Sequence, residues 1–357
     1  MKKCLVLLAA LMMLFSAATA DVILPSGITQ IEDNAFWMCK ELTGRLVIPQ
    51  GVKTIGEGAF YFCTGLTGTL TIPDGVTSIG PGAFSRCENL TGTLVIPASV
   101  KTLGSTVFAT CKGLTGLVLN EGLTSLPYQA FYNCTGLKGE LKLPSTLTSI
   151  GGIAFYSCRG LTGDLVIPAG VKTIGQGAFD SCGGFDGKLV LPEGLTTIGD
   201  IAFTACYQLC GELKLPSTLT SIGYAAFSAC SGFSGTLTIP KGVTRLEERV
   251  FSSFAGQNGA RLVLHDGITY IGAEAFRGSG IQGNLVLPDS VTYIGEEAFQ
   301  FCSRLQSITV PASVTYIGEY AFGGWNNTAR VPVKVIWGSY AHAWCIENGH
   351  PYEVYTP

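Results

Sequence analysis

One pattern returns along the chain at a nearly constant interval. A phenylalanine, usually preceded by alanine, recurs with spacings of 23, 24 or 25 residues, at Phe36, Phe60, Phe84, Phe108, Phe131, Phe155, Phe179, Phe203, Phe227, Phe251, Phe276, Phe299 and Phe322. A period of about 20 to 29 residues is typical of solenoids, in which each repeat buries its apolar face only against its neighbours. The repeat therefore argues against the roughly two or three globular domains that a length of 357 residues alone would suggest.

Other residues keep a fixed distance from each phenylalanine. In most repeats a proline stands eleven positions before it and a cysteine three positions after it, as Pro73 and Cys87 do around Phe84. The segment Leu70–Ile72 alternates apolar and polar residues, which predicts a short strand with two side chains inward. Proline ends this strand because it has no N–H to donate to a ladder. A Val-x-x-Ile-Gly segment, such as Val76–Gly80, follows the turn.

The combined motif is Cys-x-x-Leu-x-x-Leu-x-Leu-Pro-x-x-Val-x-x-Ile-Gly-x-x-Ala-Phe. It resembles the BspA-type leucine-rich repeat proteins over residues 21 to about 356, and the segment Gly338–Val354 resembles the closing unit of that family. We therefore predict a β-rich solenoid over residues 21–330, a right-handed leucine-rich repeat superhelix of about 13 coils of 23–25 residues. A C-terminal cap over residues 331–357, with a short helix and a strand, should close it. The resemblance implies an exported microbial protein that adheres to host proteins or other cells, and it transfers no catalytic residue.

The first 20 residues read as a signal peptide. Lys2 and Lys3 precede the uncharged apolar run Cys4–Phe15, and the small residues Ser16–Ala20 offer a cleavage site. The apolar run is too short to span a bilayer. No second long apolar segment or anchor is visible, so we expect a secreted or cell-surface protein with no membrane span once the signal is removed.

The charge balance excludes two classes of partner. The formal net charge is −3, and no basic excess is present to neutralise phosphates. Nucleic acid and anionic membrane surfaces are therefore not expected partners.

Cysteines in the repeat allow more than one interpretation. In an exported chain they could form disulfides, but equivalent side chains in a solenoid point in parallel, which strains such a bond. Buried thiols packing as small hydrophobic groups are the other interpretation. No histidine accompanies the column, so we expect no metal. The column consists of Cys39, Cys63, Cys87, Cys111, Cys134, Cys158, Cys182, Cys206, Cys230 and Cys302.

Catalytic motifs are missing from the sequence. Its three histidines are His265, in the proline column, and His342 and His350, in the predicted cap. They form no His-Glu-x-x-His pair, and no Gly-x-Ser-x-Gly elbow follows a predicted strand. The glycines recur with the repeat and are turn residues. We predict that the protein is not an enzyme and holds no cofactor.

A column on the outer side of the strands is mostly uncharged and β-branched. Its candidate contact residues are Val166, Val190, Val263 and Val286. Such a strip can reflect β propensity on a crowded sheet. Alternatively, contiguous exposed apolar surface marks a site for a partner.

A second column, in the Val-x-x-Ile segment, becomes aromatic near the C-terminus. It runs through Arg245, Tyr270, Tyr293 and Tyr316, which predicts an exposed ladder. Tyrosine is enriched at protein-contact hot spots, and aromatic platforms also suit sugars. Stacking between coils for stability is the structural alternative.

Irregular segments add two further hypotheses. In the tenth repeat, Leu246–Val250 and Phe254–Gly259 depart from the pattern, as a binding loop or a decayed repeat would. The N-terminal segment Val22–Pro25 begins directly as a strand, and its uncovered edge suggests an end-to-end homodimer.

Two hypotheses about function rest on the surface features that the repeat itself does not require. The first hypothesis is an exported module that binds a host extracellular or microbial surface protein. The alternative is a glycan-binding or extracellular scaffold protein that uses the aromatic ladder.

Overall fold

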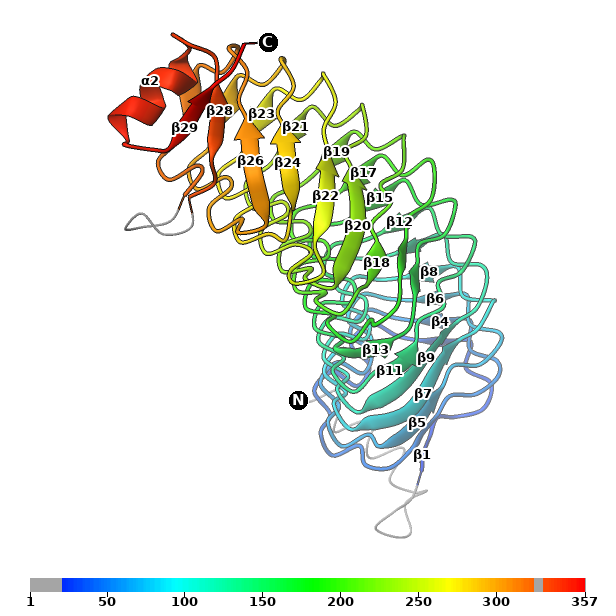
Figure 1. Cartoon of the computed structure of the whole chain (residues 1–357). Coiled ribbons are helices and arrows are strands. Elements are labelled where there is room, and N and C mark those ends of the chain that lie inside the picture. Colours follow the sequence, from blue (N-terminus) through cyan, green and yellow to red (C-terminus); the bar gives the residue numbers. More distant parts are fainter. Residues whose placement is uncertain (1–20, 324–329, 357) are drawn as a thin grey trace. The chain divides into compact units, whose positions relative to one another are not determined.

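A computed structural model describes residues 21–323 and 330–356 (Figure 1). The fold is a parallel β-solenoid of about 13 turns with one short helix and a final strand at its C-terminal end, which confirms the predicted architecture. We number the coils one to thirteen by their column phenylalanines, from Phe36 to Phe322. Each coil begins at its residue in the proline column.

The chain divides into two compact units, and each contains two rows of strands. Unit 1 runs to Val171 and includes Ala178–Gly184; unit 2 contains Lys172–Gly177 and the chain from Phe185 onward. One row, the long-strand face, lies before the proline column. The other, the short-strand face, lies in the Val-x-x-Ile segment.

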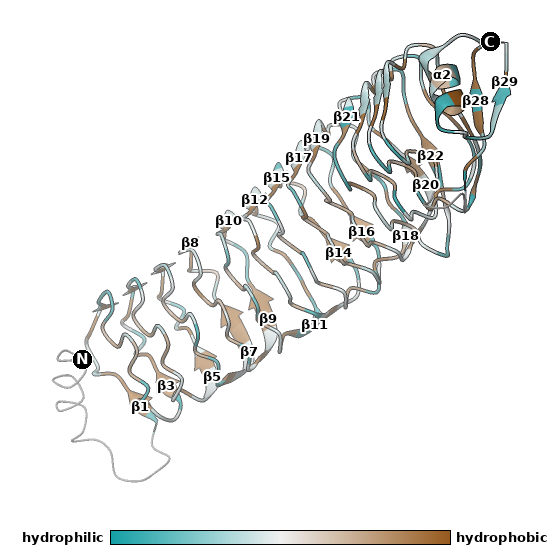
Figure 2. Cartoon of the chain, turned by 90° about the vertical axis from the view of Figure 1, so that its left-hand side faces the viewer, coloured by the Kyte–Doolittle hydropathy of each residue, from teal (hydrophilic) through white to brown (hydrophobic). Residues whose placement is uncertain are grey.

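The long-strand face of unit 1 consists of β1 (Val22–Ile23), β3 (Leu46–Val47), β5 (Gly68–Thr71), β7 (Leu90–Ile96), β9 (Leu114–Leu119), β11 (Lys138–Glu140), β13 (Gly160–Thr162) and β14 (Leu165–Val166). Its short-strand face consists of β2 (Gln30–Ile31), β4 (Thr54–Ile55), β6 (Ser78–Ile79), β8 (Thr102–Leu103), β10 (Ser125–Leu126) and β12 (Ser149–Ile150). Figure 2 shows hydrophobic colour along β5, β7 and β9.

The long-strand face of unit 2 consists of β16 (Leu189–Val190), β18 (Gly211–Glu212), β20 (Phe233–Thr238), β22 (Ala260–Val263), β24 (Gly283–Val286), β26 (Leu305–Thr309), β28 (Val333–Val335) and β29 (Tyr352–Val354). Its short-strand face consists of β15 (Thr173–Ile174), β17 (Thr197–Ile198), β19 (Ser221–Ile222), β21 (Arg245–Leu246), β23 (Tyr270–Ile271), β25 (Tyr293–Ile294) and β27 (Tyr316–Ile317).

Parallel pairing places equivalent residues of successive coils side by side. Thr54 is the register partner of Ser78, and Tyr270 is the partner of Tyr293. Because the register equals the repeat length, every sequence column becomes a physical row of side chains. A column read from the sequence therefore predicts a row on the surface or in the core.

The phenylalanine column forms the centre of the core. Phe60 and Phe84 are fully buried, and their ring centroids lie 5.2 Å apart with nearly parallel planes. The same stacking recurs between Phe227 and Phe251 at 5.6 Å. Offset stacking at such distances stabilises aromatic pairs beyond their burial.

The cysteine column has a hydrogen-bonding role within this core. The buried Cys87 Sγ donates to the carbonyl oxygen of Phe60, one coil earlier, at 3.0 Å. Burial raises the pKa of Cys63 to about 12, so this thiol is unreactive at neutral pH. The same contact to the preceding phenylalanine carbonyl is made by Cys63, Cys111, Cys134, Cys158, Cys182, Cys230 and Cys302.

The C-terminal cap continues the sheet and covers the last coil. Strand β28 pairs with both β26 and β29. Helix α2 (Tyr340–Glu347) begins after Ser339, whose Oγ accepts a hydrogen bond from His342 N at 3.2 Å. Trp344 of this helix meets the Phe322 ring edge-on at 5.6 Å. Within the described residues, no helix is long and apolar enough to cross a membrane.

Candidate partner-binding surface

The short-strand face of coils ten to thirteen carries a continuous stack of side chains. The rings of Tyr270, Tyr293 and Tyr316 lie parallel, and the centroids of neighbouring rings are 4.6 Å apart. The guanidinium carbon of Arg245 lies 3.8 Å from the Tyr270 centroid, a close cation–π contact. We call these four residues the tyrosine ladder. The structure therefore brings together the residues that the sequence column predicted.

The ladder leaves ring edges and hydroxyl groups available, but few ring faces. Both faces of Tyr270 and Tyr293 are covered by their neighbours in the stack. Tyr316, at 45% exposure, is the most open of the three. A sugar that stacks on an aromatic residue needs an open face, so this geometry disfavours the ladder as a glycan platform.

The hydroxyl group of Tyr293, at the centre of the ladder, remains a hydrogen-bond donor at neutral pH. Burial raises the pKa of Tyr293 above its ordinary value, and the neighbouring Tyr270 and Tyr316 contribute to the shift. Phenols that stay protonated can donate to carbonyl or carboxylate oxygens of a partner. The row is therefore suited to polar contacts along its edge.

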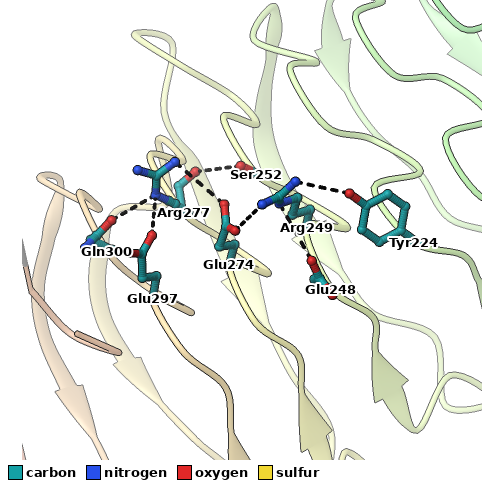
Figure 3. Close-up of polar contacts among 8 residues, drawn as sticks. All are labelled: Tyr224, Glu248, Arg249, Ser252, Glu274, Arg277, Glu297 and Gln300. Carbon is teal, nitrogen blue, oxygen red and sulfur yellow. Dashed lines mark hydrogen bonds and ion pairs between the residues drawn. The ribbon is translucent and has the colours of Figure 1, made fainter. Parts of the chain in front are cut away.

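A charged network runs beside the ladder in unit 2 (Figure 3). Arg249, from the irregular coil ten, donates to the Tyr224 hydroxyl at 3.2 Å and to the Glu274 carboxylate. Its Nε also lies 3.8 Å from Glu248. One arginine thus connects coils nine, ten and eleven.

Arg277 extends the network across coils eleven and twelve (Figure 3). Its Nε lies 2.8 Å from a Glu297 carboxylate oxygen and 2.8 Å from Gln300 Oε1, and its Nη1 lies 3.6 Å from Glu274. The Ser252 hydroxyl donates to the backbone carbonyl of Arg277 at 3.2 Å. Exposed pairs taken singly contribute little, but here each arginine is shared by several acceptors.

The charged network projects from an unusual backbone position. Arg249, Glu274 and Glu297 stand two residues before their column phenylalanines with φ of 57°, 53° and 53°. The same column holds Gly58 and Gly82 in unit 1, with φ of 56° and 58°. Left-handed backbone disfavours residues with a Cβ. The column is left-handed in both units and also holds non-glycine residues in unit 1, such as Thr106 with φ of 58°, so unit 2 differs only in placing charged side chains there.

This network was not predicted from the sequence, although part of its pattern is visible there. Arg249, Glu274 and Glu297 occupy one repeat column with spacings of 25 and 23 residues, the same kind of pattern that revealed the tyrosines. Opposite charges at neighbouring positions of a column, as at Arg249 and Glu274, predict an ion pair between coils. The contacts of Arg249 with Tyr224 and those of Arg277, which stands in a different column, required the structure.

The second irregular segment of coil ten is largely structural. Phe254 takes the place of the column cysteine and is buried, with its ring centroid 5.3 Å from that of Phe251. Asn258 Nδ2 donates to the carbonyl of Gly232 at 2.9 Å, and Arg304 donates to the carbonyl of Gln257 at 2.6 Å. These contacts fix the segment to neighbouring coils, which favours packing over a free binding loop.

The strip of β-branched residues is exposed on the long-strand face of both units. The exposed fractions are 49% at Val166 in unit 1 and 43%, 39% and 65% at Val190, Val263 and Val286 in unit 2. In unit 2, Val263 is the register partner of Thr238, and Val286 is the partner of Thr309. Their contribution to binding stays a prediction.

Histidines and metal-binding groups offer no alternative site. His350 is buried against Phe322 and Trp344, and burial lowers its pKa, so it is neutral at pH 7. Within residues 21–323 and 330–356, no three histidine, cysteine, aspartate or glutamate residues are grouped to hold a metal ion.

Comparison with known proteins places the chain in a family. A family model described as "BspA type Leucine rich repeat region" matches residues 15–138, 66–186, 138–254, 185–283 and 252–337. The chain belongs to the BspA-type leucine-rich repeat family. This membership indicates a bacterial surface leucine-rich repeat protein, of a fold that typically serves as a non-enzymatic scaffold.

The chain is also similar to solved structures of leucine-rich repeat proteins. A leucine-rich repeat protein from Bacteroides ovatus is 26% identical, with a TM-score of 0.76 over 94% of this chain and 84% of that chain. A leucine-rich cell surface protein from Faecalibacterium prausnitzii is 27% identical over 81% of this chain and 78% of its own, with a TM-score of 0.46. No curated protein sequence matches the chain.

Proposed function

We propose that the protein is an exported scaffold that binds a host extracellular or microbial surface protein through coils ten to thirteen. The observation that carries this proposal is the tyrosine ladder. The same column is filled by Thr54, Ser78 and Thr102 in unit 1, so the solenoid does not require aromatic residues there. Tyrosine and arginine dominate protein-contact hot spots because they combine a large apolar area with polar tips.

The charged network supports the same face. Its ion pairs and hydrogen bonds fix its own charged side chains before any partner arrives, and a preorganised surface loses less conformational entropy on binding. Family membership in bacterial surface proteins supports export and an external partner. Because the ring faces of the ladder are covered, a protein partner is favoured over a stacked glycan.

Binding to a panel of host extracellular and bacterial surface proteins tests the proposal. Replacing Tyr270, Tyr293 and Tyr316 together by serine, the residue type found in unit 1, should weaken binding at least about 10-fold. Tyr128→Ser and Tyr207→Ser are matched controls, because these tyrosines are exposed elsewhere, and they should bind like the native chain. Equal loss in the controls, or full binding by the triple variant, would reject the ladder as the contact surface.

An end-to-end homodimer through β1 is a secondary part of the proposal. Among the described residues β1 pairs only with β3, and Ile23 is 52% exposed. An open strand edge with an exposed apolar residue favours association. Sedimentation analysis should show a dimer that Ile23→Lys converts to a monomer; a native monomer at high concentration would remove this part alone.

A further inference from the structure

A segment of thirteen residues occurs twice in the chain without a single difference. Gly139–Gly151 and Gly211–Gly223 both read Gly-Glu-Leu-Lys-Leu-Pro-Ser-Thr-Leu-Thr-Ser-Ile-Gly, three coils apart. The first copy lies in unit 1 and the second in unit 2. The coil itself needs only the buried leucine, proline and isoleucine positions. The exposed glutamate, lysine, serine and threonine positions are identical as well, although most coils vary there.

The strand ladder stops at the same point in both copies. Strand β11 ends at Glu140 and β18 ends at Glu212. Among the described residues, no backbone hydrogen bond joins the next three residues of either copy to a neighbouring coil. At the equivalent position of coil nine, by contrast, Ile239 N donates to Val263 O at 3.0 Å. Each copy therefore presents backbone N–H and C=O groups that no other strand uses.

A groove opens over these residues in each unit. It has a volume of about 680 Å³ in unit 1 and about 610 Å³ in unit 2. The two grooves share an apolar floor and a polar rim. The floor is formed by Leu141, Leu143 and Pro168 in the first and by Leu213, Leu215 and Pro240 in the second. Both rims contain a glutamate, a lysine and a serine, and they differ in further charged residues: the first consists of Glu140, Lys142, Ser145 and Asp164, and the second of Glu193, Glu212, Lys214, Ser217 and Lys241.

The turn beside each groove is fixed by the same hydrogen bonds. The Glu121 carboxylate accepts from the backbone N and the Oγ of Ser145, both at 3.0 Å. The Glu193 carboxylate accepts from the backbone N of Ser217 at 3.1 Å and from its Oγ at 2.8 Å. These hydrogen bonds lower the pKa of Glu121, so it stays ionised at neutral pH. Both rims are thus held in one conformation.

The lysine on each rim is available to an anionic group. Lys142 forms no ion pair with any described residue. The Lys214 side chain is 83% exposed, and its one ion pair, to Glu212, is 3.8 Å long. An exposed pair of that length contributes little to stability. A carboxylate from a ligand could therefore bind either ammonium group without displacing a strong contact.

We infer that the chain carries two equivalent peptide-binding sites, one in each groove. Each site takes an extended peptide segment with an acidic side chain. The unpaired backbone of the groove forms hydrogen bonds with the backbone of the peptide, as in strand addition. The leucine and proline floor takes an apolar side chain, and Lys142 or Lys214 binds the aspartate or glutamate. These sites lie on the long-strand face and do not depend on the tyrosine ladder of the short-strand face.

Panning of a display library of random twelve-residue peptides against the purified exported chain tests the inference. The enriched peptides should carry an acidic residue flanked by β-branched or other apolar residues. Calorimetric titration with the most enriched peptide should then give two sites per chain. Lys142→Glu and Lys214→Glu should each leave one site, with affinity at the altered site reduced at least about 10-fold, and the double variant should leave none.

Matched variants keep the outcome interpretable. Lys53→Glu changes another exposed lysine, and it should retain two sites. Serine replacement of Tyr270, Tyr293 and Tyr316 should also retain two sites, so this test and that of the proposed function fail separately. Thermal melting identifies any variant that does not fold. The inference is overturned by enriched peptides without an acidic residue, by a stoichiometry of one, by peptide binding to the double variant, or by no enrichment over that variant.

Discussion

The short-strand faces of the two units differ in their side chains and agree in their backbone. In unit 1 the column contains residues such as Thr54 and Ser78, and in the last coils of unit 2 it contains Tyr270 and Tyr293, whereas the first coils of unit 2 keep threonine and serine. Both pairs are parallel register partners in strands of two residues. The buried phenylalanine column is the same behind both. The solenoid thus fixes the position of a surface residue but not its chemistry, and the differences between units are where function can be sought.

A core substitution should lower the free energy of unfolding more than any other change, and by the same amount in both units. Phe84→Ala in unit 1 and Phe227→Ala in unit 2 each remove a fully buried ring that stacks on both sides. We expect each to lower the free energy of unfolding by about 3–5 kcal/mol. Chemical denaturation measures both values. Phe301→Ala, which truncates an exposed ring, is the control and should cost less than about 1 kcal/mol.

A large difference between the two core variants would contradict a shared core. It would show that one unit tolerates a cavity by relaxing around it, because the measured effect depends on how far a site collapses. The surface comparison would then need to be corrected for unequal stability of the units.

Substitutions in the left-handed column, two residues before each phenylalanine, should have the next largest effect on stability. Gly82→Glu introduces into unit 1 the residue type that Glu297 supplies in unit 2, and we expect a loss of about 1–2 kcal/mol from backbone strain. A Cβ at Gly82 would meet its nearest side-chain atom at 3.5 Å, so crowding adds little. Asparagine tolerates this conformation, and Gly82→Asn should cost less. The reverse change, Glu297→Gly, relieves strain but removes the ion pair to Arg277, so it should alter stability by less than about 1 kcal/mol.

Urea denaturation of these three variants checks the argument. A clear gain in stability from Glu297→Gly would mean that the ion pair does not offset the backbone strain. Equal losses from Gly82→Glu and Gly82→Asn would mean that side-chain size, rather than the left-handed conformation, sets the cost.

The charged network should have a smaller, salt-dependent effect. Arg249→Met keeps the length of the side chain but leaves the Glu274 carboxylate, whose side chain is only 18% exposed, without its main partner. We expect a loss of about 1 kcal/mol at low salt, since Arg249 is itself partly exposed and screened. Lys112→Met removes the single pair to Glu88, 3.2 Å long, in unit 1 and should cost about 0.5 kcal/mol or less.

Denaturation at low and at high ionic strength distinguishes a network from separate pairs. The loss in Arg249→Met should shrink as salt rises, because screening weakens the interactions that it removes. The same loss in both variants would indicate that sharing an arginine among several acceptors adds nothing.

The sequence predicted columns well and contacts between unlike columns poorly. Regular spacing was enough to predict that Phe60 stacks on Phe84 and that Tyr270, Tyr293 and Tyr316 form a row, because the register in a solenoid equals the repeat length. It was not enough for Arg249 with Tyr224, because that contact depends on the direction of a side chain that leaves a left-handed backbone. Dihedral angles at non-glycine positions are not encoded in an apolar pattern.

The grooves illustrate a second limit. The repetition of Gly139–Gly151 at Gly211–Gly223 is visible in the sequence, but the end of the strand ladder after Glu140 is not. Polar and apolar side chains alternate from Glu140 to Leu143, as they do in an ordinary strand. Whether its backbone finds a partner depends on the spacing of the neighbouring coils, which no single coil determines.

The smallest expected effect is the alkaline titration of the ladder. The pKa of Tyr293 is raised above its ordinary value of 10.0 by burial and by its two tyrosine neighbours. The folded state therefore holds this proton more tightly than the unfolded state does. The resulting stability is fully present below about pH 10 and is lost as pH rises through the folded-state value. Spectrophotometric titration should show that Tyr293→Phe removes one late-ionising phenol, whereas Tyr270→Ser together with Tyr316→Ser should shift Tyr293 toward earlier ionisation. An unshifted Tyr293 in that double variant would mean that burial by the coil, rather than stacking in the ladder, sets its pKa.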